Sequence, residues 1–145
     1  MPLRGTYEPS PWTPVADQVE LYESSGGTDG LLLEGKPCVI LWTTGRKSGL
    51  VRKTPLMRVT DGRRYAVVAS MGGAPQSPVW YFNLTQDPHV SLQDGPVLKD
   101  YLARQVEGDE KTEWWAAATD VWPAYDDYQA ATDRVIPLIV LDPVD

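Results

Sequence analysis

One stretch in the first half of the chain combines bends and positive charge in a way that suits anion binding. Thr43–Pro55 contains glycines at positions 45 and 49, and glycine lets the backbone bend through positive φ and approach a ligand closely. Fixed cations together with exposed amide donors suit a phosphate or a carboxylate. The alternative is a solvated basic hairpin tip, whose charges contribute little, and the residues alone leave both interpretations open. The cations of this basic loop are Arg46, Lys47, Arg52 and Lys53.

Neither of two common phosphate-binding motifs is present in the basic loop. It lacks the Walker A spacing, and no helix is predicted directly after it, as a dinucleotide fingerprint requires. An apolar run, residues 39–42, precedes the loop, and Pro55 with an alternating pattern follows it. The arrangement therefore predicts a strand, a loop and a second strand.

Two further groups of residues could bind a planar molecule. The turn Ser70–Ala74 places a hydroxyl and two glycines after an apolar strand, so a flat ligand could lie against bare backbone there; the alternative is an ordinary loop. Trp122, Tyr125 and Tyr128 are three residues apart and share one face if they are helical. They either plug the end of the fold or form an aromatic wall whose phenols can donate hydrogen bonds.

The composition excludes several kinds of site. The single histidine, His89, and the single cysteine, Cys38, are too few for a zinc site or a Cys–His dyad, so no metal is predicted. Cys38 lies in an apolar run and is predicted to be a core residue. Because a single cysteine cannot form an internal disulfide, a reducing compartment is expected.

The net charge of −7 argues against nucleic acid as a partner, yet residues 46–64 hold seven Lys and Arg residues and a single acid. A basic segment on an acidic protein favours a site for one anionic molecule.

The elements that position these groups follow from turn signals and periodicity. Helices are predicted to begin at Thr13, Ser77, Asp109 and Pro123. Asp61-Gly62 and Asp94-Gly95 are hairpin signals, and Pro137 suggests that the strand Val135–Leu141 is an edge strand or contains a bulge. About six strands and three or four short helices predict an α+β fold, a mostly antiparallel barrel with helices at its ends.

The length of 145 residues predicts a single domain, residues 1–145. Residues 1–11 contain three prolines and few apolar groups and are predicted to be a loose N-terminal arm. The chain shows no signal-peptide pattern and no apolar run of membrane-spanning length. A cytoplasmic location is therefore expected.

The sequence resembles the deazaflavin-dependent nitroreductases, actinobacterial oxidoreductases that use coenzyme F420 and adopt a split β-barrel of FMN-binding-like fold. The resemblance extends from about Leu31 to Pro143. It is carried in order by the basic loop, by Val67-Val68-Ala69-Ser70 with Gly72-Gly73-Ala74-Pro75, by Trp80 with Asn83-Leu84, and by Pro123–Gln129 leading to Thr132-Asp133-Arg134 and Ile136-Pro137.

The resemblance implies a site for coenzyme F420, whose phosphodiester and glutamate tail make it polyanionic. It assigns the phosphate to Lys47 and Arg52 with the backbone of residues 44–48, and it places Arg46 and Lys53 within reach of the tail carboxylates. The turn Ser70–Ala74 is placed beside the deazaflavin ring. The implied cofactor-binding residues are Thr44, Gly45, Arg46, Lys47, Ser48, Arg52, Lys53, Thr54, Pro55, Ala69, Ser70, Met71, Gly72, Gly73 and Ala74.

The resemblance also implies the reaction: hydride transfer from reduced F420 to a planar, electron-poor acceptor, which is a quinone, a nitroaromatic or an activated enone. Tyr128 and Ser70 are the implied catalytic residues, with water as the other proton source. The implied substrate-binding residues are Ser70, Trp122, Tyr125 and Tyr128.

Two alternatives to this reductase remain open at this point. One is a coenzyme-binding or storage module without turnover, because the loop signal is stronger than the substrate-pocket signal. The other is a split-barrel protein that binds FMN, against which the length of the basic loop argues. A homodimer is a further expectation, as is peripheral membrane contact if the acceptor is a lipid quinone.

Overall fold

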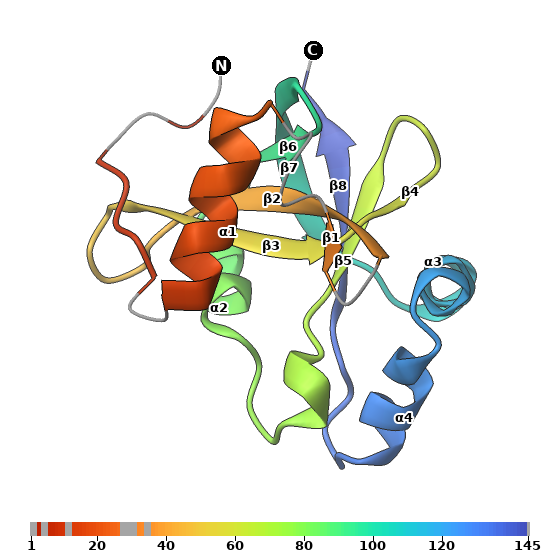
Figure 1. Cartoon of the computed structure of the whole chain (residues 1–145). Coiled ribbons are helices and arrows are strands. Elements are labelled where there is room, and N and C mark those ends of the chain that lie inside the picture. Colours follow the sequence, from red (N-terminus) through yellow and green to blue (C-terminus); the bar gives the residue numbers. More distant parts are fainter. Residues whose placement is uncertain (1–2, 4–5, 11–12, 27–31, 34–35, 145) are drawn as a thin grey trace.

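The structure, a computed structural model, describes residues 3, 6–10, 13–26, 32–33 and 36–144. Within these residues the chain forms one curled sheet with helices packed around it (Figure 1). The strands are β1 (Leu32–Leu33), β2 (Lys36–Thr44), β3 (Val51–Met57), β4 (Val59–Thr60), β5 (Tyr65–Val68), β6 (His89–Asp94), β7 (Val97–Gln105) and β8 (Leu138–Pro143). The helices are α1 (Thr13–Ser24), the short 3₁₀ turn η1 (Met71–Gly73), α2 (Val79–Gln86), α3 (Gly108–Val121) and α4 (Ala124–Ala130).

The strand order explains why the sheet curls. From β2 the order runs through β6, β7, β8 and β5 to β4, while β3 pairs with the other side of β2, and all these ladders are antiparallel. The strands β3 and β4 thus stand at opposite ends of the order, yet only Arg58 separates them in the chain. Because consecutive residues cannot be far apart, the two ends of the sheet must come together. The predicted α+β split barrel is confirmed.

Strand alternation sorts the apolar side chains onto two faces of the sheet. Val39 and Leu41 of β2 point into the barrel, whereas Cys38 and Ile40 point outward under α1. Burial raises the pKa of the Cys38 thiol to about 11, which fits the predicted core role. The barrel interior is completed by Val67, Ala69, Trp80, Leu84, Val90, Leu92, Tyr101, Ile139 and Leu141. On the outer face, Trp114 and Ala118 of α3 and Tyr125 of α4 pack against the sheet. This cluster is completed by Met57, Val59, Ala66, Val68, Val106, Ile136, Leu138 and Val140.

Both predicted hairpins are confirmed. Thr60 pairs with Tyr65 across the first turn, and Asp94 pairs with Val97 across the second. Gly62 and Gly95 have φ values of +98° and +61°, a region that residues with a Cβ rarely adopt. The two glycines therefore allow the tight hairpin turns that the sequence predicted at these positions.

Three details differ from the sequence expectations. The structure has eight strands among the described residues instead of about six, since β1 and β4 are two residues long and too short to show a period. Pro137 lies before β8, which is an interior strand between β7 and β5, so the expected edge position is wrong. Trp122 lies in the break between α3 and α4 and not on a helix.

Residues 6–8 run beside β3. The amide of Val51 donates to the carbonyl of Thr6 (2.8 Å), and the amide of Glu8 donates to the carbonyl of Val51 (2.9 Å). Residues 1–2, 4–5 and 11 of the predicted arm lie outside the described residues, as do Gly27 and Leu31. No helix in the described part of the chain combines the length and apolarity needed to cross a bilayer.

Candidate functional site

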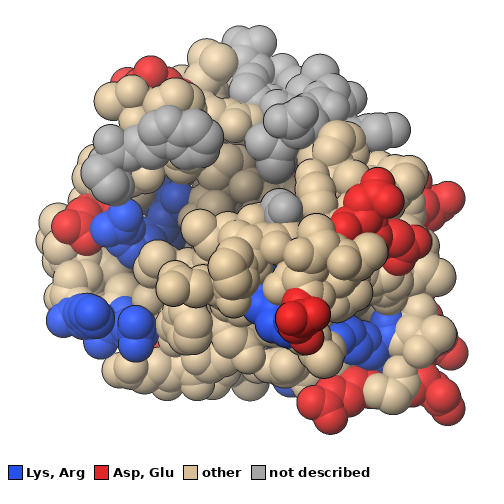
Figure 2. Space-filling view, turned by 90° about the horizontal axis from the view of Figure 1, so that it is seen from below, with Lys and Arg blue, Asp and Glu red and all other residues tan. Residues whose placement is uncertain are grey.

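Two cavities meet at the indole of Trp80. The larger one, of about 570 Å³, we call the loop cavity; the smaller one, of about 370 Å³, we call the aromatic cavity. Seen from below, basic side chains gather beside a hollow in this face (Figure 2). The loop cavity is lined by Glu8, Ser10, Val15, Gly45, Arg46, Lys47, Ser48, Arg52, Lys53, Thr54, Val79, Trp80 and Asn83. The aromatic cavity is lined by Leu56, Met57, Val68, Ser70, Met71, Pro78, Trp80, Trp122, Tyr125 and Tyr128.

The amide side chain of Asn83 fixes the start of the basic loop. Asn83 is buried on α2; its Oδ1 accepts a hydrogen bond from the backbone N–H of Arg46 (3.1 Å), and its Nδ2 donates to Thr43 Oγ1 (3.2 Å). Both groups of a buried amide must be satisfied, and here both are used on the loop. The position of the loop is therefore set by α2.

The hydrogen bonds within the basic loop leave two backbone N–H groups without an acceptor in the described part of the chain. The N–H of Gly45 donates to the carbonyl of Leu50 and that of Gly49 to the carbonyl of Gly45, each at 2.8 Å. Leu50 N–H donates to Ser48 Oγ (3.1 Å). The amides of Lys47 and Ser48 have no acceptor in the described part of the chain. An anion at the tip of the loop would be met by these two donors.

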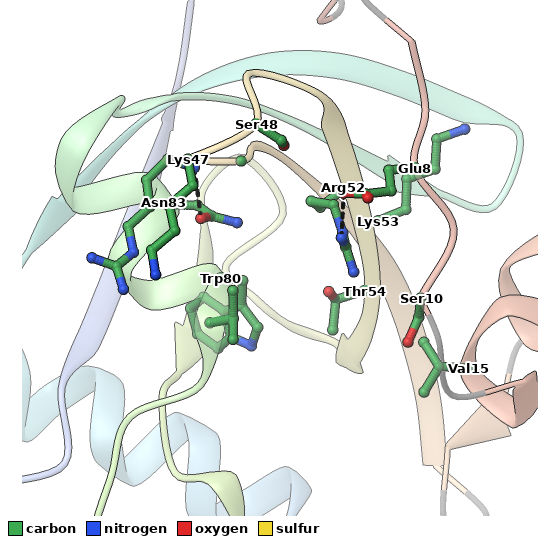
Figure 3. A pocket seen from close by; sticks show the side chains of 13 residues that line it. Glu8, Ser10, Val15, Lys47, Ser48, Arg52, Lys53, Thr54, Trp80 and Asn83 are labelled. Atoms are coloured by element: carbon green, nitrogen blue, oxygen red, sulfur yellow. Dashed lines mark hydrogen bonds and ion pairs between the residues drawn. The ribbon is translucent and has the colours of Figure 1, made fainter.

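The four loop cations have different surroundings. Arg52 forms an ion pair with Glu8 (2.6 Å), and the guanidinium of Arg46 lies over the ring of Phe82, 5.1 Å from its centroid. Lys47 has no ionic partner among the described residues. Figure 3 shows Lys47 and Arg52 extending in the same direction from opposite sides of the loop cavity, with Trp80 below them. These two cations can address one anion together.

Lys53 faces a different region. Its ammonium forms an ion pair with Glu23 of α1 (2.6 Å) and lies between two rings, 4.2 Å from Trp42 and 4.4 Å from Tyr7. In Figure 3 its side chain points away from the centre of the loop cavity. The Lys53 ammonium thus stabilises the packing of α1 against β3, although Lys53 also lines the loop cavity.

The turn Ser70–Ala74 contributes Ser70 and Met71 to one wall of the aromatic cavity and is strained. Met71 has φ +46°, and Gly73 has φ +82°. A Cβ on Gly73 would lie 2.9 Å from the carbonyl oxygen of Tyr128, so only glycine lets η1 come this close to α4. The hydroxyl of Ser70 has no hydrogen-bond partner among the described residues and is not sealed from the cavity.

The opposite wall is aromatic. The indole Nε1 of Trp122 donates to the hydroxyl oxygen of Tyr128 (3.2 Å), and the rings of Tyr125 and Tyr128 meet edge to face at 6.1 Å. Burial raises the pKa of Tyr125 well above its ordinary value, so this phenol stays protonated. The hydroxyl hydrogen of Tyr128 has no acceptor in the described structure, which leaves it free to donate to a bound molecule.

Most of the predicted site residues line one cavity or the other. Seven predicted residues of the basic loop line the loop cavity, and five predicted residues of the turn and the aromatic group line the aromatic cavity. The three aromatic residues line one wall although Trp122 is not helical. Predicted residues that line neither cavity are Thr44, Pro55, Ala69, Gly73 and Ala74.

Several lining residues were not predicted as site residues, and Glu8, Trp80 and Asn83 make the most specific contacts among them. Glu8 reaches Arg52 across 44 residues, and no local pattern signals such a pair. Trp80 and Asn83 belong to a short helix whose place beside the loop is a tertiary property; the available hint was their presence in a motif that carries the family resemblance. Within the described chain, no group of three His, Cys, Asp or Glu residues could hold a metal ion.

The chain is similar in sequence and fold to several known proteins. A sequence model of the F420H(2)-dependent quinone reductase family matches residues 15–143. An F420H(2)-dependent quinone reductase of Mycobacterium tuberculosis is 36% identical over 125 residues, which cover 83% of this chain and 84% of that protein. A solved structure of the F420-H2 dependent reductase FDR-A is 48% identical, covers 73% of this chain and 94% of its own, and has a TM-score of 0.70. A structure described as a domain-swapped dimer is 45% identical, covers 92% of this chain and all of its own, and has a TM-score of 0.73.

Proposed function

The chain belongs to the F420H(2)-dependent quinone reductase family, and on this premise we propose how its two cavities divide the work. The protein is an oxidoreductase that uses coenzyme F420 and transfers a hydride to a quinone. The loop cavity holds the anionic tail of the coenzyme. The aromatic cavity holds the reactive ring and the acceptor.

The loop cavity fits the tail of F420 because its donor groups match the groups of that tail. A phosphodiester needs cations and N–H donors. Lys47 and Arg52 extend into one space, and the amides of Lys47 and Ser48 are without an acceptor among the described residues. Arg46, next to them and free of ionic partners in the described structure, serves a tail carboxylate.

The aromatic cavity fits a planar ring and a planar acceptor. Ser70 and Met71 of the turn form one wall, Trp122, Tyr125 and Tyr128 form the other, and the lining is mostly apolar. When bound, reduced F420 supplies the hydride, and the chemistry of that transfer is the cofactor's own. The chain contributes position, which in favourable cases lowers a barrier by about 7–11 kcal/mol.

The Tyr128 hydroxyl is the group best placed to deliver a proton to the reduced acceptor. Its oxygen accepts from Trp122 Nε1, while its hydrogen is free among the described residues. That indole hydrogen bond also stabilises negative charge on the phenol oxygen as the proton leaves. The Ser70 hydroxyl lines the same cavity and is the second candidate.

The observation that carries this proposal is the meeting of the two cavities at Trp80, with cations on one side and phenols on the other. Titration of the purified protein with oxidised F420, followed by absorbance, tests the binding half. Oxidation of reduced F420 by menadione tests the reaction. Binding without turnover by any quinone would support the storage alternative, and a protein purified with flavin absorbance would support the FMN alternative. The family match favours the reductase over both.

The rims of the cavities favour an apolar acceptor. Met71 at the aromatic cavity is 57% exposed, and Val79 at the loop cavity is 69% exposed. Apolar side chains around an opening suit a lipid quinone delivered from a membrane surface. Co-sedimentation with vesicles that contain a lipid quinone tests this point. A protein that stays in the supernatant and still reduces water-soluble quinones would limit the acceptors to dissolved ones.

Self-association is proposed from one relative. A structure 45% identical to this chain is described as a domain-swapped dimer, and swapping is a low-cost route to a homodimer when two copies share the same elements. Light scattering after size exclusion would give twice the 16.1 kDa chain mass if this chain pairs in the same way. A single-chain mass over the working concentration range would contradict the proposal.

A further inference from the structure

Arg134 has no part in the function proposed above, yet its guanidinium makes four hydrogen bonds to one short region. Nε donates to the carbonyl of Ala74 (2.8 Å), NH2 donates to the carbonyls of Ser70 (2.8 Å) and Ala69 (3.1 Å), and NH1 donates to Ser77 Oγ (3.2 Å). All four acceptors belong to the turn Ser70–Ala74, whose first two residues line the aromatic cavity, or to the flanks of this turn. The planar fork of arginine matches this set of oxygens, which an ammonium group cannot span.

The partners of Arg134 differ from those of other arginines in the structure. Arg104 donates to the carboxylates of Glu110 and Asp142, and Arg58 donates to that of Asp94. Arg134 has no carboxylate partner among the described residues and instead binds backbone carbonyls and a hydroxyl. Hydrogen bonds of this kind fix a backbone conformation instead of neutralising a charge.

The same segment is also tied to the opposite wall of the aromatic cavity. Gln129 of α4 donates through Nε2 to the carbonyl of Arg134 (2.8 Å), and its Oε1 accepts from the amide of Ile136 (2.9 Å). On the other side, Gly73 packs against the backbone of Tyr128. The turn and α4 are therefore connected twice, once by direct packing and once through Gln129 and Arg134.

We propose that Arg134 is a positioning residue that sets the spacing between the turn Ser70–Ala74 and the wall formed by Tyr125 and Tyr128. This inference rests on the proposed function, since it concerns the placement of ring and acceptor between those walls. A turn that contains a non-glycine residue at φ +46° persists only where its surroundings hold it. The four bonds of Arg134 supply that hold.

The expected effect is on rate more than on affinity. The basic loop is anchored by Asn83 and lies in the other cavity, so the loss of Arg134 leaves the tail site in place. A shift of one wall by about 1 Å is enough to lower the rate of a positioned reaction about 100-fold. A residue that merely stabilised the fold would not separate these two quantities.

The test compares Arg134→Gln with Arg104→Gln, a matched loss of an arginine that makes several hydrogen bonds and lines neither cavity. At a temperature well below both melting points, we expect Arg134→Gln to slow single-turnover oxidation of reduced F420 by menadione about 10- to 100-fold. The dissociation constant for oxidised F420 should change less than about 3-fold, since the cations remain. Arg104→Gln should leave both values unchanged.

A second readout needs neither coenzyme nor turnover. Amide hydrogen exchange in the coenzyme-free protein should accelerate at Gly73 and Ala74, whose N–H groups close the turn onto Ser70 and Met71, in Arg134→Gln and not in Arg104→Gln. If Arg134→Gln does not fold, Arg134→Lys takes its place in every measurement, because a lysine keeps the charge and can satisfy part of the acceptor set.

The possible results separate the two proposals. A wild-type protein that does not oxidise reduced F420 overturns the proposed function. Suppose instead that the wild-type protein oxidises reduced F420. If the Arg134 variant then has the same single-turnover rate and the same amide exchange at Gly73 and Ala74 as the wild type, the role of Arg134 alone is overturned. Equal losses of rate in the Arg134 and Arg104 variants would also overturn it, because they would indicate a general effect on the fold.

Discussion

The loop cavity and the aromatic cavity share Trp80 but are held in place by different forces. Around the loop cavity, charged side chains carry the contacts: Arg52 pairs with Glu8, and Lys53 pairs with Glu23. Around the aromatic cavity, the contacts are uncharged or go to the backbone: Trp122 binds Tyr128, and Gly73 packs against α4. One side is dominated by charged groups, and the other by close packing between two walls.

The difference has a physical consequence. Ion pairs that are partly exposed are screened by salt and tolerate small displacements. Close packing and short hydrogen bonds respond weakly to salt but strongly to a shift of a few tenths of an ångström. We therefore expect changes at the loop cavity to alter coenzyme affinity in a salt-dependent way, and changes at the aromatic cavity to alter turnover without a salt dependence.

Tyr128→Phe should give the largest effect. It removes the only hydroxyl that binds Trp122 Nε1 among the described residues, and loss of a general acid lowers a rate by about 10²-fold or more. Steady-state turnover with menadione, measured beside the affinity for oxidised F420, checks this. The matched control is Tyr81→Phe, which removes a hydroxyl bound to Gln105 outside both cavities. A fall in coenzyme affinity with normal turnover would contradict the assignment.

Gly73→Ala tests the spacing of the walls. The new Cβ meets the Tyr128 carbonyl oxygen at 2.9 Å and the Tyr128 Cα at 3.1 Å, so η1 must move away from α4. We expect turnover to fall about 10- to 30-fold and the free energy of unfolding to fall by about 1–3 kcal/mol.

The control for this variant is Gly95→Ala, at a glycine of similar φ (+61°) with no atom within 4 Å of a new Cβ. It should lose about 1–2 kcal/mol of stability from the left-handed backbone alone and keep its turnover. Chemical denaturation and turnover assays measure both quantities. Equal losses of turnover in the two variants would mean that the spacing has no special role.

Lys47→Ala should act on affinity instead. Removal of one charge-assisted contact to the coenzyme tail is expected to weaken F420 binding about 10-fold at low salt, and the difference from the wild type should shrink as ionic strength rises. Lys99→Ala removes an exposed lysine that does not line the loop cavity and should leave binding unchanged. A salt-independent loss in Lys47→Ala would argue for a change in loop shape instead of a lost charge.

Glu8→Gln should give the smallest effect, and in the opposite direction. The Glu8 carboxylate pairs with Arg52, which the proposed site assigns to the coenzyme tail, so its neutralisation should tighten F420 binding about 2- to 5-fold, the scale of a partly exposed ion pair. Glu23→Gln is the matched control. Its partner Lys53 points away from the centre of the cavity, so this variant should not change the affinity for F420. Identical titration curves for wild type and Glu8→Gln would show that Arg52 does not bind the tail.

The sequence predicted the parts of the site that depend on neighbouring residues. The glycines and cations of Thr43–Pro55 are contiguous in the chain, so their contribution to a cavity could be inferred before the fold was known. The glycines at positions 62 and 95 likewise fix their hairpins through local backbone conformation.

Features that depend on distant residues could not be predicted in this way. Arg134 and Ser70 are 64 residues apart, and nothing in either neighbourhood indicates the contact. The charge count did not indicate that the Lys53 ammonium pairs with Glu23, because this contact depends on a helix 30 residues earlier in the chain. Pro137 indicated an edge strand by a rule that holds within strands, whereas the strand begins one residue later.

The insertion of β8 between β7 and β5 has a consequence for how the protein is made. This strand is the last in chain order, yet it pairs with residues 65–68, about half the chain earlier. Contacts of such long sequence separation slow folding, and until they form, β5 and β7 each present an unpaired edge. On a ribosome, all described residues that line the loop cavity emerge before α3, whereas the described lining of the aromatic cavity includes residues of α4. The residues of the proposed coenzyme-tail site therefore leave the ribosome before those of the proposed reactive site are complete.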